Sequence, residues 1–146
     1  MIRKIEQKDR KIYLDMAKAF YESDAVLHSV DEQNFINTFN ELMRSDAYAE
    51  CYLMETDGHI AGYALLSKTF SQEAGGLVYW IEEIFVLPEF RSMGLGKEFF
   101  SFLNNRLPQN TKRLRLEVEE DNTRAFSLYK KLGFKELPYL QMYLKK

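Results

Sequence analysis

The sequence predicts an α/β fold in which residues 1–146 form a single domain. Two observations carry this prediction. Apolar residues switch repeatedly between strand-like and helix-like spacing along the chain, and Asp57-Gly58 separates two strand-like runs near its middle. A chain of 146 residues with no linker, repeat or low-complexity tract is long enough for one sizeable core. We therefore expect strands and helices to alternate around an antiparallel hairpin run.

The first third of the chain predicts one strand and two helices. The alternation in Ile2–Glu6 is typical of a short strand, and it does not resemble a signal peptide. Asp9 is placed to cap a helix that ends at about Tyr21, and a second apolar stripe at helical spacing predicts a helix over about Asp31–Ser45.

The remaining elements follow from the same patterns. The expected strands are Tyr48–Thr56, Ile60–Thr69, Leu77–Leu87, Arg113–Val118, Phe134–Leu137 and Gln141–Leu144. The expected helices are Lys97–Leu107 and about Thr123–Leu132, with Gly133 as the glycine just past the end of the second.

Composition narrows the class of protein. A net charge of −2 gives no general attraction to nucleic acid, and no apolar run approaches the length of a membrane span. The single cysteine, Cys51, cannot form an intramolecular disulfide and sits in a strand-like run, which favours a buried structural thiol over a nucleophile. We expect a cytoplasmic protein with no nucleic-acid or membrane partner.

The most informative segment is the turn that follows the predicted strand Leu77–Leu87. Two glycines, Gly94 and Gly96, come just before a helical pattern, and Arg91 lies beside them. A strand, a glycine turn and a helix leave uncapped N–H groups at the positive end of the helix dipole, which suits a phosphate or pyrophosphate. The alternative is that the two glycines only make a tight connection between the strand and the helix, with no ligand. The segment lacks the Gly-Lys-Ser/Thr of a P-loop and the third glycine of a dinucleotide fingerprint.

A second informative segment follows the predicted strand Arg113–Val118. Asn122, Ala125 and Tyr129 share one face of the next predicted helix. Read singly, Asn122 is a plausible helix cap and Tyr129 a plausible core tyrosine. The two segments together, in this order and about 30 residues apart, indicate a shared site.

These two segments resemble the signature of the GNAT superfamily of N-acetyltransferases. Arg91-Ser-Met-Gly94-Leu-Gly96 matches the family's Arg/Gln-x-x-Gly-x-Gly/Ala motif, and the later Asn…Ala…Tyr…Gly-Phe pattern ends at Gly133-Phe134. The order of the predicted elements resembles the family fold over nearly the whole chain. The resemblance implies a mixed, mostly antiparallel sheet, splayed between strands 4 and 5 and flanked by about four helices.

The resemblance also implies acetyl-CoA as co-substrate, with no metal. Backbone groups of the fourth strand would pair with the pantetheine arm, the glycine turn would hold the pyrophosphate, and Asn122 would bond the pantetheine region. Tyr129 would be the general acid for the leaving thiolate. The expected cofactor-binding residues are Ile84, Phe85, Val86, Arg91, Ser92, Met93, Gly94, Leu95, Gly96, Lys97, Asn122, Ala125 and Tyr129.

Two carboxylates in the fourth strand are candidates for the acceptor side. Adjacent strand residues face opposite sides, so only one of Glu82 and Glu83 points into the acceptor pocket unless a bulge intervenes. That residue would act as a base or bind a cationic amine, and the alternative is that both are solvated or ion-paired. Weaker candidates for substrate contact are Tyr21, Asp24, His28, Trp80 and Tyr139.

The function expected from these residues is acetyl transfer to a primary amine, with a small cationic amine as the leading acceptor class. Protein N-termini or lysines come second. A GNAT-like module that binds acyl-CoA without turnover, and a nucleotide-phosphate site on an unrelated α/β fold, are the rival readings. The resemblance allows a homodimer, although no residue demands one.

Overall fold

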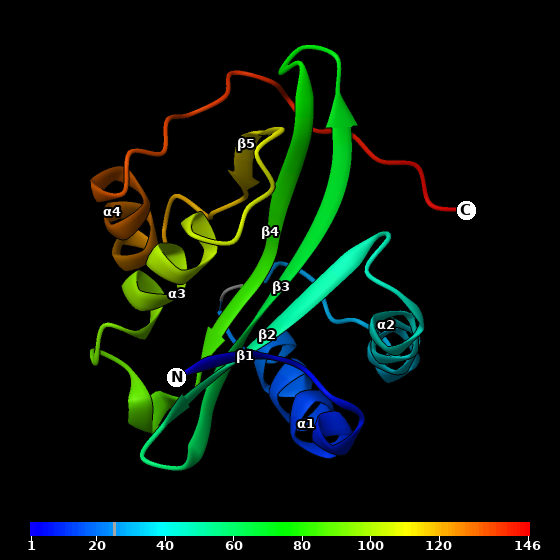
Figure 1. The fold of residues 1–146 in the computed structure, drawn as a ribbon, viewed down its shortest axis with the longest axis vertical. Coiled ribbons are helices and arrows are strands. Elements are labelled where there is room, and N and C mark those ends of the chain that lie inside the picture. Colours follow the sequence, from blue (N-terminus) through cyan, green and yellow to red (C-terminus); the bar gives the residue numbers. More distant parts are fainter. Residues whose placement is uncertain (25) are drawn as a thin grey trace.

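A single five-stranded sheet runs through the protein, with strands in the order β1-β2-β3-β4-β5. The computed structural model describes residues 1–24 and 26–146, and Figure 1 shows the arrangement. The strands are β1 (Ile2–Lys4), β2 (Ala49–Thr56), β3 (His59–Ser71), β4 (Gly76–Val86) and β5 (Thr111–Leu116). The first four pair antiparallel and β5 joins β4 in parallel, so the sheet is mixed and mostly antiparallel as predicted.

Four α-helices cover the two faces of this sheet. They are α1 (Arg10–Tyr21), α2 (Glu32–Arg44), α3 (Leu95–Asn104) and α4 (Thr123–Lys131), with short 3₁₀ turns at Gln7–Asp9 and Pro88–Phe90. The first two helices lie on one side of the strands and the last two on the other (Figure 1). The apolar core is accordingly in two parts, one under α1 and α2 and one under α3.

The splay predicted between the fourth and fifth strands is present. β4 pairs with β5 from Leu77 to Ile81, with a register shift between Leu77 and Val78, and the rest of β4 has no partner in β5. The backbone edge of β4 beyond Ile81 is therefore open where the glycine turn and α4 approach.

Gly62 in β3 supports this part of the sheet from the other side. A Cβ at Gly62 would lie 2.2 Å from the Phe85 carbonyl oxygen, which is closer than any real contact. Only glycine allows β3 to approach β4 this closely, just before β4 ends.

The hairpin turn at Asp57-Gly58 is confirmed, with positive φ at both residues. The predicted role of Gly133 at the end of α4 is also confirmed, and Cys51 is buried; Asp31, the predicted first residue of the second helix, is its N-cap and accepts a hydrogen bond from the Gln33 N–H. Asp9 does not cap α1. Its carboxylate accepts hydrogen bonds from Arg3 Nη1 and from the Glu6 backbone N–H, both at 2.8 Å.

The two C-terminal strands predicted at Phe134–Leu137 and Gln141–Leu144 are absent from the structure. Residues 134–146 carry no regular secondary structure, and the sheet ends at β5. The chain leaves α4 and crosses the β3–β4 turn to the side of α2 (Figure 1). The reason is physical: an extended segment becomes a strand only when its backbone pairs with another strand, and this segment does not run along β5.

Across residues 1–24 and 26–146, none of the helices combines the length and the apolar character that a membrane crossing requires.

Candidate active site

A β-bulge in β4 decides which of the two adjacent glutamates faces the interior. Glu83 pairs with Leu65 and Ile81 with Leu66, so Glu82 is an extra residue in the ladder. Ile81 therefore packs on the α3 face, whereas Glu83, two residues later, points to the α1 face. Glu83 is buried, and the exposed Glu82 carboxylate accepts a hydrogen bond from the Ser67 hydroxyl.

Two tyrosine hydroxyls hold the Glu83 carboxylate. Tyr21 at the end of α1 donates to Oε1 and Tyr63 of β3 donates to Oε2, both at 2.6 Å. Burial raises the pKa of Glu83, and the two hydrogen bonds, which favour the charged form, oppose this rise in part. Burial also raises the pKa of both tyrosines, so they remain donors at neutral pH. The result is a fixed carboxylate with enhanced affinity for a proton.

The glycine turn has the backbone geometry that its sequence indicates. Ser92 and Gly94 have φ of 67° and 79°, and α3 begins directly after Gly94. No side chain caps this helix start, so its first N–H groups are available to a ligand. Because α3 starts at Leu95, two residues before the predicted Lys97, Gly94 is the N-cap and not part of a longer loop.

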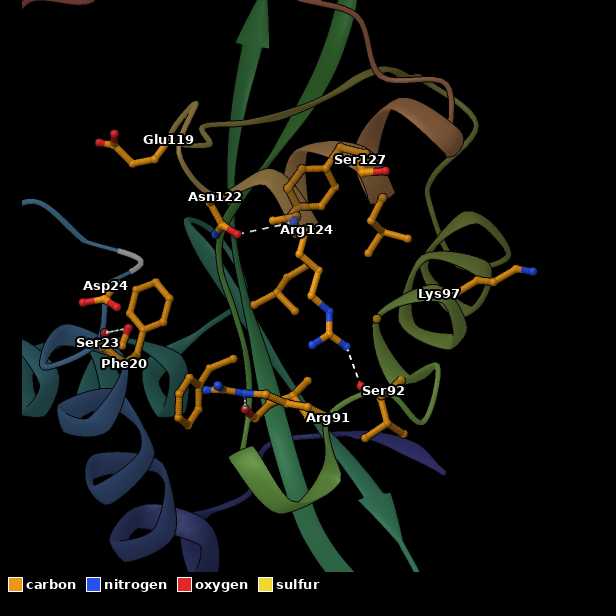
Figure 2. Close-up of a pocket in the computed structure, with 18 of the residues that line it drawn as sticks. Phe20, Ser23, Asp24, Arg91, Ser92, Lys97, Glu119, Asn122, Arg124 and Ser127 are labelled. Carbon is orange, nitrogen blue, oxygen red and sulfur yellow. Dashed lines mark hydrogen bonds between the residues drawn. The ribbon is translucent and has the colours of Figure 1, made fainter.

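A hydrogen bond connects the glycine turn to the start of α4. Arg124 Nη2 donates to Ser92 Oγ at 2.8 Å, and Figure 2 shows the Arg124 side chain reaching from α4 to the turn. Arg91 lies on the other side of the turn, where its Nε donates to the Val86 carbonyl at 3.0 Å. The Arg124 guanidinium thus lies beside the turn at the helix start, whereas that of Arg91 extends toward β4.

Asn122 and Tyr129 come from the first and second turns of α4. The Asn122 side chain caps the helix by accepting from the Ala125 N–H at 3.3 Å, so the simpler reading of this residue holds. The ring of Tyr129 packs edge-on against Phe100 and Phe134, with centroids 5.9 and 5.8 Å away. Burial raises the pKa of Tyr129, so its hydroxyl stays protonated at neutral pH.

These elements surround a groove of about 1390 Å³ between β4, the glycine turn and α4 (Figure 2). Almost all of the predicted cofactor-binding residues line it: Ile84, Phe85, Val86, Arg91, Ser92, Gly94, Leu95, Gly96, Lys97, Asn122, Ala125 and Tyr129. The Lys97 side chain points away from the groove, so this residue faces it with its backbone.

The groove meets a smaller cavity of about 110 Å³. The two share Phe20, Ile84, Glu119, Asn122, Ala125 and Tyr129. The smaller cavity is also lined by Glu82, Glu83 and Glu117, and no lysine or arginine lines it. Four glutamates therefore surround the small cavity, whereas the groove is mixed in charge, because Arg91, Lys97, Arg124 and Lys131 line it together with Glu22, Asp24, Glu119 and Asp121.

The backbone of β4 offers its open edge to this groove at Ile84 and Val86. The Leu87 N–H bonds to Ala61 of β3, and the Phe85 carbonyl lies against Gly62. Since donors and acceptors alternate along an antiparallel strand, Phe85 bonds toward β3 and its two neighbours point outward. Among the three predicted residues, the Ile84 and Val86 backbone groups are thus the ones that the open edge presents, and Phe85 also lines the groove.

Several weaker candidates lie outside the site. Met93, His28 and Tyr139 line neither cavity and are exposed, and Trp80 stacks under the Arg115 guanidinium at 4.1 Å. Asp24 lines the groove, and Tyr21 reaches the site through its hydrogen bond to Glu83. Trp80 lies outside the site because it precedes the bulge in β4. Tyr139 lies outside it because the predicted C-terminal strands do not form.

The structure adds residues that the sequence reading missed. Arg124, Leu128 and Lys131 line the groove. Leu128 follows Ala125 by three residues, so helical spacing was sufficient to place it on that face. The sequence did not indicate a role for Tyr63 in the site, because a tyrosine in an otherwise apolar strand is common. Within residues 1–24 and 26–146, no group of three or more His, Cys, Asp or Glu residues is arranged to hold a metal ion.

With this geometry established, comparison with known proteins gives the family. The Acetyltransferase (GNAT) family matches residues 10–134. The chain belongs to this family.

Individual proteins of similar sequence are also N-acetyltransferases by name. The chain is 33% identical over 85 residues to "Uncharacterized N-acetyltransferase YhfO" of Bacillus subtilis, covering 58% of this chain and 57% of that protein. It is 35% identical over 79 residues to a thialysine N-epsilon-acetyltransferase of Bos taurus, covering 53% of this chain and 46% of that protein. The chain thus spans about half the length of these curated relatives.

Among solved structures, the aminoglycoside acetyltransferase AAC(6')-Iy, crystallised with a CoA-containing bisubstrate analogue, superposes with a TM-score of 0.81. It is 20% identical and the match covers 100% of this chain and 97% of that one, which establishes a common fold.

The raised pKa of Glu83 leads to a stability prediction. In the unfolded chain a glutamate carboxyl has its ordinary pKa of 4.5, and in the folded protein the pKa of Glu83 is higher. Such a group stabilises the folded protein fully at pH values below 4.5, and this stabilisation is lost as pH rises through the pKa of the folded state. We expect the free energy of unfolding of the wild-type protein to fall, relative to that of Glu83→Gln, as pH is raised from about 4.5 to 8. Urea denaturation at a series of pH values measures this difference.

The neighbouring substitution Glu82→Gln is the matched control, because it removes an exposed carboxylate one residue away. The difference in unfolding free energy between the wild type and Glu83→Gln should change with pH more than the difference between the wild type and Glu82→Gln. If the first difference stays constant with pH, or changes as the second does, the pKa of Glu83 is not raised.

Proposed function

We propose that this chain is an acetyl-CoA-dependent N-acetyltransferase that transfers an acetyl group directly to a primary amine, and that the acceptor is a small cationic amine. The observation that carries the proposal is that a groove with Arg91 and Arg124 among its lining residues meets, at Tyr129 and Ile84, a smaller cavity lined by four glutamates. We also propose that residues 1–146 act as one domain, in the cytoplasm.

The groove suits acetyl-CoA along its length. The uncapped start of α3 and the guanidinium groups of Arg91 and Arg124 would receive the pyrophosphate, since both supply donors and positive charge. The open edge of β4 at Ile84 and Val86 would pair with the amide groups of the pantetheine arm, as an added strand does. Acetyl-CoA would supply the thioester at the end of this arm.

Two side chains flank the point where the cavities meet and would move the protons. The amine nitrogen bonds to the acetyl carbon as the carbon–sulfur bond breaks. Glu83, whose pKa is raised by burial, would accept the proton that the amine loses, and Tyr129 would donate its hydroxyl proton to the sulfur. The outward-facing N–H of Val86 would support the carbonyl oxygen.

The carboxylates around the small cavity support a cationic acceptor. Among the described residues, the lining of this cavity contains no lysine or arginine and four glutamates, Glu82, Glu83, Glu117 and Glu119. A second positive charge on the substrate would therefore be attracted to it. The names of two similar proteins point the same way, since one acts on thialysine and another on an aminoglycoside.

An acetyl-CoA turnover screen tests the proposal. Release of free CoA thiol is measured with diamines and polyamines, aminoglycosides, amino acids with a free side-chain amine, and peptides with free N-termini. We expect turnover with the cationic small amines and kcat/KM values at least ten-fold lower for neutral or acidic acceptors. Acetyl-CoA binding with no turnover on any amine would instead identify a non-catalytic acyl-CoA-binding module, and preference for peptides would identify a protein acetyltransferase.

Tyr129→Phe tests the proposed general acid. We expect kcat to fall about 10- to 100-fold with acetyl-CoA affinity nearly unchanged, because only the proton donor is removed. Tyr48→Phe, which removes a hydroxyl from an exposed ring outside both cavities, is the control. An unchanged kcat in Tyr129→Phe would remove this residue from the chemistry.

Gly94→Val tests the glycine turn. Both Gly94 and Gly58 have positive φ, 79° and 74°, and neither has an atom near its Cβ position, so valine strains the backbone equally at the two sites. We expect both variants to lose similar stability in thermal melts, and only Gly94→Val to bind acetyl-CoA at least ten-fold more weakly by calorimetry. Equal acetyl-CoA affinity in the two variants would refute the turn as the pyrophosphate site.

A further inference from the structure

The face of the sheet that turns toward α1 and α2 carries an indole ring with a guanidinium stacked on it. Ile81 of β4 packs in the cluster under α3, so its neighbour Trp80 lies on the opposite face. Leu114 and Leu116 of β5 pack against the same cluster, which places Arg115 on the face of Trp80. The central carbon of the Arg115 guanidinium lies 4.1 Å from the centre of the Trp80 ring. The two side chains together form a flat surface, the Trp80–Arg115 platform.

This platform borders the small cavity on two strands. Ser67 of β3 pairs with Trp80, and its hydroxyl donates a hydrogen bond to Glu82, which lines the cavity. On β5, Leu116 directly follows Arg115 and also lines the cavity. Trp80 therefore lies between Ser67, which holds a carboxylate of the cavity, and the guanidinium of Arg115.

The protein does not neutralise the positive charge of Arg115 with a partner. Within the part of the chain that the structure describes, its guanidinium has no hydrogen bond and no ion pair, and it contacts Trp80 by stacking. Arg113, on the same face of β5, differs, because its Nη2 lies 3.6 Å from a carboxylate oxygen of Glu73. A guanidinium held flat on an aromatic ring presents its N–H donors in a fixed plane, which suits a planar carboxylate. The platform therefore offers a site for an anionic group beside a cavity that attracts cations.

We propose that the Trp80–Arg115 platform binds the far end of the acceptor, and that the acceptor is a free amino acid whose side chain carries the primary amine, as that of lysine does. This inference rests on the proposed function and names the substrate class for it. The side-chain amine would enter the small cavity and reach Glu83, and the aliphatic stem would lie toward Trp80. The α-carboxylate would bind Arg115, and the α-ammonium group would lie near Glu82.

The size of the cavity and the spacing along β4 fit such a molecule. The cavity of about 110 Å³ is smaller than the roughly 300–1,000 Å³ of a typical ligand site, so it receives only one end of the acceptor. Glu83 is three residues beyond Trp80 and the bulge takes up one of them, so the two positions are roughly 7 to 10 Å apart along the strand. A simple diamine suits this arrangement less well, because its second ammonium group would approach the guanidinium of Arg115.

A pair of matched acceptors tests the platform. L-lysine and L-lysine amide differ only in the α-carboxylate, and release of free CoA thiol from acetyl-CoA gives kcat and KM for each. We expect the wild-type protein to have a kcat/KM at least ten-fold higher for lysine. Arg115→Gln should abolish this preference by raising the KM for lysine, with kcat nearly unchanged because the amine still reaches Glu83. Arg113→Gln, which removes a guanidinium already paired with Glu73 on the same face, should keep the preference.

Two further variants separate the roles of shape and charge. Arg115→Lys keeps the positive charge and loses the planar set of donors, so we expect only part of the preference for lysine to survive. Glu82→Gln should weaken the KM for lysine and leave that for ε-aminocaproate, which has no α-ammonium group, nearly unchanged. Thermal melts of all four variants show whether each is folded as the wild type is.

Calorimetric titration of lysine and of its amide into the CoA-loaded protein repeats the comparison without turnover. A protein that acetylates no amine but binds lysine more tightly than the amide, through Arg115, would refute the proposed reaction and support the platform. A protein that acetylates cationic amines with the same kcat/KM for lysine and its amide would keep the proposed function and overturn the platform. A preference that survives in Arg115→Gln, or the absence of binding of either compound, would overturn it as well.

Discussion

The site depends on one irregularity in the β4 ladder. The extra residue at Glu82 breaks the two-residue alternation, so that Ile81 packs under α3 while Glu83 enters the opposite layer and meets Tyr21 and Tyr63. Without the bulge, Glu83 and Ile81 would share a face, and the carboxylate would lie in the apolar layer under α3. The same bulge comes just after the last residue that pairs with β5, so it also begins the open edge of β4.

The electrostatic character of the two cavities follows from where β4 opens. On one side the chain continues into the glycine turn, whose uncapped helix start and neighbouring arginines suit an anion. On the other side the loop after β5 contributes Glu117 and Glu119 to the carboxylates of β4. Tyr129 lies between these regions because α4 begins at Thr123, directly after its cap Asn122, and brings its second turn to the boundary.

The sequence was sufficient for the features that local rules determine. The hairpin at Asp57-Gly58, the glycine after α4 at Gly133 and the glycine turn each depend on a few adjacent residues, and each formed as predicted. Local rules could not predict which face of the sheet Glu83 points to. That face is determined by the bulge, and the bulge depends on how β3 and β4 pair along their length. The prediction of two C-terminal strands was wrong, because a strand needs a pairing partner and local sequence does not specify one.

The hydrogen bond from Arg124 to Ser92 has a consequence for ligand entry. It joins the two walls of the groove across 32 residues of sequence, so a ligand that takes Arg124 for itself must first open this bridge. Because this hydrogen bond is exposed to solvent, breaking it costs such a ligand little free energy. The affinity of that ligand therefore reports its new contacts with Arg124, less the contact with Ser92 that they replace.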